Sequence, residues 1–163
     1  MPRGFTLIEM LVVIMLMGVL IGLVSISVSP DERGRLRVEA ERLAQLLSLA
    51  SDESRLTGKP IRWSASDNGY RFLRLRKDGE WGEIRDNDTL RARTLASGTQ
   101  ITGLSVNARS RSVRQLEFVP YETPQLFSIN MTLGEERASV TSTPVGEIRV
   151  ILGSEEANAA IAR

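Results

Sequence analysis

The chain begins with MPRGFTLIEM (residues 1–10), and an almost unbroken apolar run of Leu, Val, Ile and Met continues from there to Val28. A helix over residues 5–28 would reach roughly 35 Å, enough to cross a hydrocarbon layer about 30 Å thick. Glu9 is the one ionisable residue in this run. Because a carboxylate inside a membrane span is costly, Glu9 is a candidate functional residue.

The order of charged, small and apolar residues differs from that of a secretory signal peptide. A signal peptide carries its apolar segment before a small-residue cleavage site and loses that segment. Here the small residue Gly4 precedes the apolar run, and the basic residue Arg3 precedes Gly4. Cleavage after Gly4 would leave the apolar helix as the mature N-terminus, starting at Phe5. The alternative is an ordinary signal anchor that contains an accidental Glu.

The unbroken match from Arg3 to Glu9 resembles the class III signal of type IV pilins and type II secretion pseudopilins. The resemblance implies that a prepilin peptidase cleaves between Gly4 and Phe5, and that Phe5 is then N-methylated. It also implies that Phe5 and Glu9 act in assembly, with Glu9 pairing with the N-terminal ammonium of a neighbouring subunit. Opposite charges in lipid are less costly together than apart. Such head-to-tail contacts build open filaments.

Composition limits what the rest of the 163-residue chain can do. About 135 residues remain for one soluble domain with a single core. The formal net charge of +1 gives no strong attraction to nucleic acid. The chain has no His and no Cys, which excludes disulfides, His-based catalytic triads and most zinc sites. We therefore expect no enzyme activity, no cofactor, no metal ion and no small-molecule substrate.

An amphipathic helix is predicted over residues 31–57. Pro30 ends or kinks the preceding apolar helix, and Gly58 is suited to end this one. Between them, charged residues occupy most of one side. The other side carries residues at spacings of four and three, namely Leu36, Ala40, Leu43, Leu47, Ala50 and Ser54. This stripe predicts a helix that covers a sheet.

Beyond Gly58 the hydrophobic period changes to two, which predicts a β-rich domain over residues 58–153. Asp67-Asn68-Gly69 is a strong hairpin-turn signal, and residues 107–112 read as an exposed loop. For the first three strands, over residues 61–84, the natural assembly is a meander of antiparallel strands packed on the helix. Strands are expected at residues 61–65, 70–75, 81–84, 101–106, 113–119, 126–133, 138–141 and 148–152. The tail, residues 154–163, is expected to be flexible.

Downstream motifs are similar to those of the minor pseudopilin H proteins of type II secretion systems. They are Arg42-Leu43-Ala44, Gly58-Lys59-Pro60-Ile61, Tyr70-x-Phe72, Trp81, Phe118-x-Pro120 and Gly146-Glu147-Ile148. The sequence departs from the family pattern at Tyr121-Glu122-Thr123, where a Gly-containing turn is more usual. The resemblance implies an α+β, pilin-like fold. In it, a long N-terminal helix, membrane-spanning in its first half and continuous as one spine, packs on an antiparallel β domain of two sheets.

The resemblance also implies a division of the chain and a role. Residues 1–4 would be the leader, 5–28 the transmembrane helix, 31–57 the continuing helix, 58–153 the β domain and 154–163 the tail. The protein would be a minor pseudopilin near the tip of the secretion pseudopilus, with other major and minor pseudopilins, the prepilin peptidase and the inner membrane as partners. Arg3 favours a cytoplasmic N-terminus, which puts the soluble domain in the periplasm.

Two alternatives to this role are a minor type IV pilin involved in pilus assembly or DNA uptake, and a membrane-tethered enzyme. Binding of DNA would need several arginine contacts to phosphate. Arginines could form a basic patch or a solvated strand face; they are Arg71, Arg74 and Arg76, with Arg109, Arg111 and Arg114. The tail instead carries two acids and one arginine, so we expect no nucleic-acid partner.

One acidic stretch bears on metal binding. Asp86-Asn87-Asp88 offers clustered oxygens that could bind calcium or form a solvated turn. Three adjacent residues lack the spacing of a known calcium loop. We therefore expect a solvated turn.

Overall fold

The computed structural model describes residues 7–27, 31–66, 68–85 and 89–153, and for residues 19–27 it describes the backbone alone. The chain divides into two units, Met1–Asp31 and Glu32–Arg163. Several expectations fall outside the described residues: the leader 1–4, the kink at Pro30, the Asp86-Asn87-Asp88 turn and the tail 154–163. Because residues 28–30 are also outside them, a continuous spine stays a prediction.

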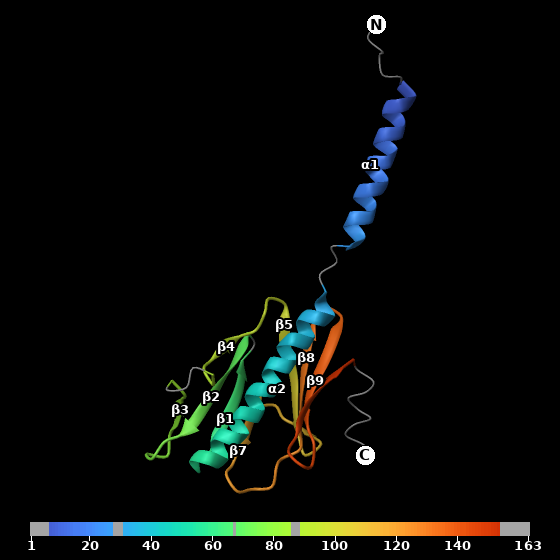
Figure 1. Cartoon of the computed structure of the whole chain (residues 1–163). Coiled ribbons are helices and arrows are strands. Elements are labelled where there is room, and N and C mark those ends of the chain that lie inside the picture. The colour runs from blue at the N-terminus through green and yellow to red at the C-terminus, as the bar shows by residue number, and fades with distance from the viewer. Residues whose placement is uncertain (1–6, 28–30, 67, 86–88, 154–163) are drawn as a thin grey trace. The chain divides into compact units, whose positions relative to one another are not determined.

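The first unit is the helix α1, Leu7–Ser27 (Figure 1). It is apolar on all sides, and its large side chains from Leu7 to Met17 are exposed. Glu9 lies in its first turn, where an acidic group suits the positive end of the helix dipole. Among the residues whose side chains the structure describes, no helix is long and apolar enough to cross a membrane. The membrane span over residues 5–28 therefore stays a prediction.

The second unit begins with the amphipathic helix α2, Glu32–Thr57. All six residues of the predicted stripe are buried, and Leu36, Leu43 and Leu47 have no exposed surface. Gly58 follows the helix with φ +65°, a left-handed conformation that glycine adopts without a steric penalty. The 3.6-residue periodicity of apolar side chains thus marked both the helix and the face that it buries.

The remaining strands form two antiparallel sheets. In the first, the order is β3-β2-β1-β7, and the short β4 pairs with the start of β2 while β3 pairs with its end. Alternation places Ile61 and Trp63 of β1 in the core. The strands are β1 (Ile61–Ser66), β2 (Gly69–Leu75), β3 (Trp81–Glu83), β4 (Arg93–Thr94) and β7 (Gln115–Phe118).

The second sheet has the order β10-β9-β8-β5-β6. Strands β8 and β9 are joined by a two-residue turn, Gly134-Glu135. Pairing of β5 with β8 shifts register between Ile101 and Gly103. The strands are β5 (Thr99–Val106), β6 (Arg109–Ser110), β8 (Phe127–Leu133), β9 (Glu136–Ser142) and β10 (Ile148–Leu152).

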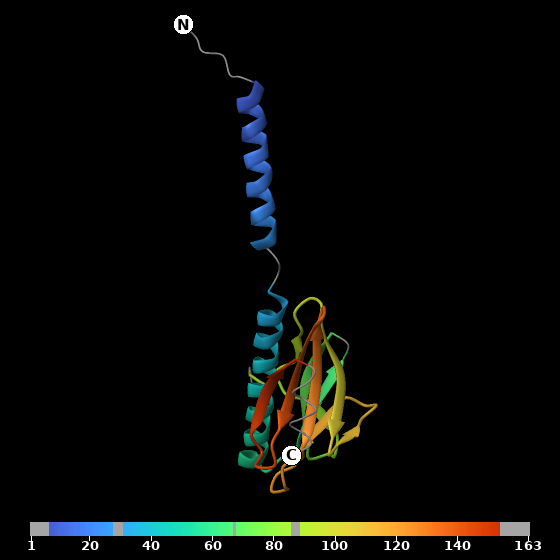
Figure 2. The same ribbon diagram turned by 90° about the vertical axis from the view of Figure 1, so that its right-hand side faces the viewer.

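The core lies where α2 packs along both sheets (Figure 2). Under the helix, the first sheet contributes aromatic rings: Tyr70 lies 6.3 Å from Trp63 and 6.0 Å from Phe72, measured between ring centroids. The second sheet contributes aliphatic side chains, including Ile129 and Val140, which are fully buried. The α+β fold with a helix packed on two antiparallel sheets is confirmed.

Strands β1, β2 and β3 form the expected antiparallel meander, since β2 pairs with both of its neighbours in sequence. Strand β7 then returns to pair with β1, while β5 pairs with β8 of the other sheet. One local expectation was wrong. Residues 107–112 are not a simple loop, because Asn107 and Ala108 form a two-residue turn with φ of 50° and 61° and lead into β6. Positive φ at both central positions is typical of a tight hairpin turn.

Candidate functional site

Of the residues predicted to act in processing and assembly, the structure describes Glu9. Its side chain is exposed in the first turn of α1. Gly4 and Phe5 lie outside the described residues. Their roles, and the pairing of Glu9 with a neighbouring ammonium, therefore stay predictions.

The exposed side of α2 carries charged pairs. Arg37 Nε donates to Glu41 at 2.7 Å, and Arg42 donates to Glu39 at 3.0 Å. The hydrogen bond that Arg37 donates to Glu41 raises the pKa of the Arg37 guanidinium above its usual value. Pairs at these spacings support a helix surface modestly and are screened by salt. Arg37 and Glu41 are well solvated, whereas the Glu39 side chain keeps only 12% of its surface exposed.

Polar contacts fix the C-terminal end of α2 to the first sheet. Ser54 is buried, and its hydroxyl donates to the backbone oxygen of Phe118 at 2.9 Å. Glu53 accepts from Arg74 of β2 at 3.1 Å, and both side chains of this pair are mostly buried. A hydrogen-bonded pair has a preferred geometry, whereas apolar contacts tolerate sliding. These contacts therefore set where α2 sits along the sheet.

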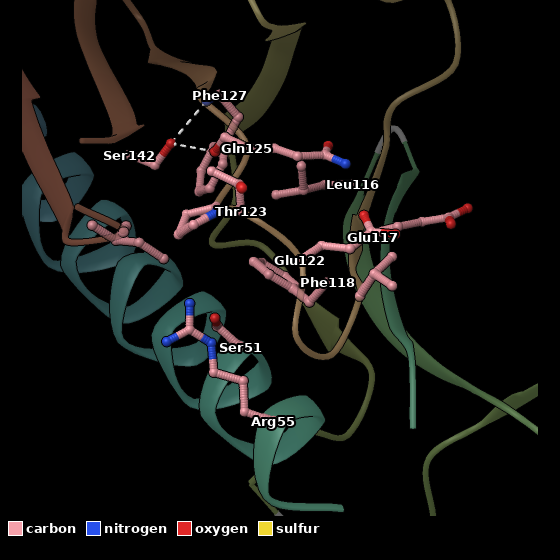
Figure 3. A pocket seen from close by; sticks show the side chains of 14 residues that line it. Ser51, Arg55, Leu116, Glu117, Phe118, Glu122, Thr123, Gln125, Phe127 and Ser142 are labelled. Carbon is pink, nitrogen blue, oxygen red and sulfur yellow. Dashed lines mark hydrogen bonds between the residues drawn. The ribbon is translucent and has the colours of Figure 1, made fainter. Parts of the chain in front are cut away.

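A small cavity of about 40 Å³ lies beside this end of the helix (Figure 3). Ser51 and Arg55 of α2 line one side, and the segment after β7 lines another. Ser142 closes it by donating to the Gln125 backbone oxygen and accepting from the Phe127 amide, both at 2.8 Å. This volume holds a few water molecules but not a substrate-sized ligand.

The arginines of β2 do not share a face. Arg71 and Arg74 are three residues apart along a strand, so their side chains point to opposite sides of the sheet. Arg74 is paired with Glu53, and Arg76 follows the strand with its side chain against Gly82. The structure therefore does not gather these three arginines into one DNA-binding surface.

The second group of arginines is also divided. Arg109 and Arg111 are exposed at β6 and beyond it. Arg114 instead donates to the backbone oxygen of Ile101 at 2.7 Å, so it contributes to the attachment of one sheet to the other. Within the described ranges, no group of three or more Asp or Glu side chains is placed to hold a metal ion.

Neither Glu53 nor Ser142 stands out in the sequence. Glu53 lies on the same helix as many exposed acids, and no local pattern distinguishes it from them. Ser142 joins segments 15 and 17 residues away, through its bonds to Phe127 and Gln125. Only the paired strands bring these groups together.

Two families match the chain. Residues 2–25 match the prokaryotic N-terminal methylation motif, and residues 39–146 match the family described as type II transport protein GspH. The type II secretion system protein H of Pseudomonas aeruginosa is 41% identical over 73 residues. That region is 44% of this chain and spans 42% of the relative, less than half of its length.

Two solved structures share the fold. Both are of the minor pseudopilin EpsH from the type II secretion system of Vibrio cholerae. One has 20% identity and a TM-score of 0.59, covering 74% of this chain and 99% of that one. The other has 18% identity and a TM-score of 0.57, covering 75% and 96%. At these identities the likeness establishes the fold alone.

Proposed function

The chain belongs to the type II transport protein GspH family, and on that premise we propose that it is a minor pseudopilin. It serves as a structural subunit of the type II secretion pseudopilus near the tip, supporting protein export across the outer membrane. One observation carries this proposal: the methylation motif at residues 2–25 and the GspH region at residues 39–146 occur in one chain. The first supplies a filament-forming N-terminus and the second the domain displayed on it.

In this proposal the N-terminal segment is processed and then assembled. The prepilin peptidase cleaves between Gly4 and Phe5, Phe5 is N-methylated, and α1 lies in the inner membrane with the soluble domain in the periplasm. The exposed apolar surface of α1 supports this placement, since such side chains are stable in lipid. Glu9 pairs with the ammonium of a neighbouring subunit, which fixes the register between two helices.

The domain of α2 and two sheets is then an interaction module rather than a catalyst. Partners of the domain are other major and minor pseudopilins. The divided arginines give no support to DNA as a partner.

Crosslinking in intact cells tests the assembly role of Glu9. We expect Glu9→Val to insert and to be processed, because the peptidase acts before assembly, but to lose its crosslinks to other pseudopilins. Ile8→Val, the neighbouring position, is the matched control and should crosslink as the unaltered chain does. An unchanged crosslinking yield for Glu9→Val would remove Glu9 from the assembly role.

Intact mass of the membrane-extracted protein tests processing. The mass should fall by the four leader residues and gain one methyl group. Gly4→Glu should keep the leader, because the peptidase requires a small residue before the bond. A fully processed Gly4→Glu protein would contradict the assigned cleavage site.

A further inference from the structure

A cleft of about 230 Å³ opens between α2 and the edge of the first sheet. Glu39 and Arg42 of α2 line one wall, Tyr70 of β2 lies at the base, and residues 91–94, which include β4, form the other wall. It lies apart from the small cavity described above, which is lined from Ser51 onward along α2. Neither the predicted assembly residues nor the family match assigns a role to this cleft.

Strand pairing directs two polar side chains into it. Tyr70 and Arg93 are directly opposite each other in the antiparallel pair of β2 and β4. Residues opposite each other in such a pair point to the same face of the sheet. Tyr70 faces α2 with Phe72, so Arg93 also faces α2. The two side chains therefore line the cleft together with Glu39 and Arg42.

Both side chains carry hydrogen-bond donors that lack acceptors. The Tyr70 hydroxyl and Arg93 Nε are buried and have no hydrogen-bond partner among the residues that the structure describes. Tyr70 is 4% exposed, so its hydroxyl is shielded from bulk water. Burial raises the pKa of Tyr70 to about 12, which keeps the hydroxyl protonated at neutral pH. A buried donor without an acceptor is costly, and a guanidinium can only donate.

The charges of the lining residues indicate whether the acceptor that these donors lack is neutral or negatively charged. Among the described residues that line the cleft, three are arginines, Arg42, Arg91 and Arg93, and one is an acid, Glu39. Glu39 already accepts from Arg42 at 3.0 Å. Arg93 makes one long contact, from its terminal nitrogen to the Thr89 backbone oxygen at 3.4 Å. A water molecule could accept from Tyr70, but it would leave the excess positive charge in place.

We propose that this cleft binds a carboxylate group from a neighbouring pseudopilin subunit. The identity of the partner rests on the function proposed above, whereas the carboxylate chemistry rests on the cleft itself. A carboxylate is the anionic group of an unmodified protein, and its two oxygens can accept from Arg93 and Tyr70 together. The volume suits one side chain or one chain terminus rather than a drug-sized ligand, whose pockets begin at about 300 Å³.

Short peptides distinguish the two sources of a carboxylate. The full chain in a non-ionic detergent is titrated with three blocked or free peptides while the amide signals of Ala92 and Thr94 are followed by NMR. The first is acetyl-Ala-Ala-Glu-Ala-Ala-amide, the second acetyl-Ala-Ala-Gln-Ala-Ala with a free C-terminus, and the third the same Gln peptide amidated. We expect saturable shifts with one of the first two and none with the third.

Two variants localise the binding. Arg93→Gln should weaken it by at least about tenfold, the effect of losing one charge-assisted hydrogen bond. Tyr70→Phe removes only the hydroxyl and should weaken binding while keeping the fold. Arg76→Gln, which removes the same charge elsewhere on the sheet, is the control and should bind as the unaltered chain does. The amide spectrum of each variant reports whether it is folded.

Several results would overturn the carboxylate site. They are equal shifts with the neutral peptide, binding unaffected by Arg93→Gln and Tyr70→Phe in folded protein, or no saturable shift with either carboxylate. Saturable shifts with inorganic phosphate alone would likewise overturn it in favour of a phosphate group. These titrations do not depend on filament assembly. If no peptide binds while Glu9→Val loses its crosslinks as expected, the carboxylate site is wrong and the proposed function stands.

Discussion

The two helices of this protein have similar lengths and opposite surfaces. Helix α1 is apolar all round and exposes large side chains, with Glu9 in its first turn. Helix α2 buries one stripe and covers its other side with charged pairs such as Arg37–Glu41. In α1, the apolar surface has no partner within the compact unit Glu32–Arg163, and the membrane proposed above would supply an apolar surrounding for it. In α2, stability comes from tertiary packing within the chain.

The difference indicates where each helix can be altered. A change in α1 acts on the contact with whatever surrounds it, since α1 is outside the compact unit Glu32–Arg163. A change on the buried side of α2 acts on the folding of that unit.

Leu47→Ala should lower the free energy of unfolding of the domain by about 2–5 kcal/mol, because it leaves a cavity under α2. Leu47 has no exposed surface. Met15→Ala, the matched change in α1 at a side chain that is 67% exposed, should leave the unfolding of the domain unchanged. Urea unfolding in a non-ionic detergent, followed by tryptophan fluorescence, measures both. An equal decrease in the free energy of unfolding for both variants would show that α1 and α2 do not differ in this way.

Alkaline titration examines the aromatic layer beneath α2. Burial raises the pKa of Tyr70 to about 12 from the ordinary value of 10.0. Stability is unaffected by Tyr70 below pH 10; as pH rises from about 10 to 12, the unfolded chain loses the proton first and the domain loses about 2 kcal/mol. Phenolate absorbance should show a late step that Tyr70→Phe removes. A late step that persists in Tyr70→Phe would contradict the assignment.

Glu53→Gln should lower the free energy of unfolding by about 1 kcal/mol, because it weakens the mostly buried contact with Arg74. Asp52→Asn makes the same charge change one residue earlier, where the side chain is exposed, and serves as the control. Thermal unfolding compares them. If Asp52→Asn lowers the stability of the domain as much as Glu53→Gln does, the charge of the helix, rather than the contact between Glu53 and Arg74, determines that stability.

Arg37→Gln should give the smallest effect, no measurable change in the midpoint of thermal unfolding. Its pair with Glu41 is exposed on both sides, at 62% and 46% of the side-chain surface, and is screened by solvent. Raising the salt concentration should likewise leave the midpoint of the unaltered domain in place. A clear fall in the midpoint of thermal unfolding for Arg37→Gln would mean that this face of α2 packs against another part of the folded domain.

Much of the fold followed from periodicity. The stripe from Leu36 to Ser54 predicted α2 and its buried face, and strand alternation located the longer strands, including those bearing Trp63 and Phe72. The strands β4 and β6 were missed because two residues, as in Arg93–Thr94, carry no period. The division into two sheets came from family resemblance, since alternation reports which face is buried but not which strand is the partner.

The candidate sites divide in the same way. The site at Arg3 to Glu9 could be predicted from the sequence because its residues are adjacent in the chain. The cleft at Tyr70 could not, because it needs α2, β2 and β4 to meet. Arg71, Arg74 and Arg76 do not form a basic patch, because Arg71 and Arg74 are three residues apart in β2 and point to opposite faces of the sheet.

The attachment of α2 also determines how the domain carries mechanical load. The chain enters the domain at Glu32, whereas the polar contacts of Glu53 and Ser54 lie near the far end of the helix. A force that pulls on Glu32 along the helix axis shears the contacts between the buried side of α2 and the sheets. All of these contacts must then slip together. Resistance to such a force is set by the rate of crossing the unfolding barrier. Thrust or traction delivered along α2 is therefore spread over the whole interface, whereas a sideways force would peel the helix away one turn at a time.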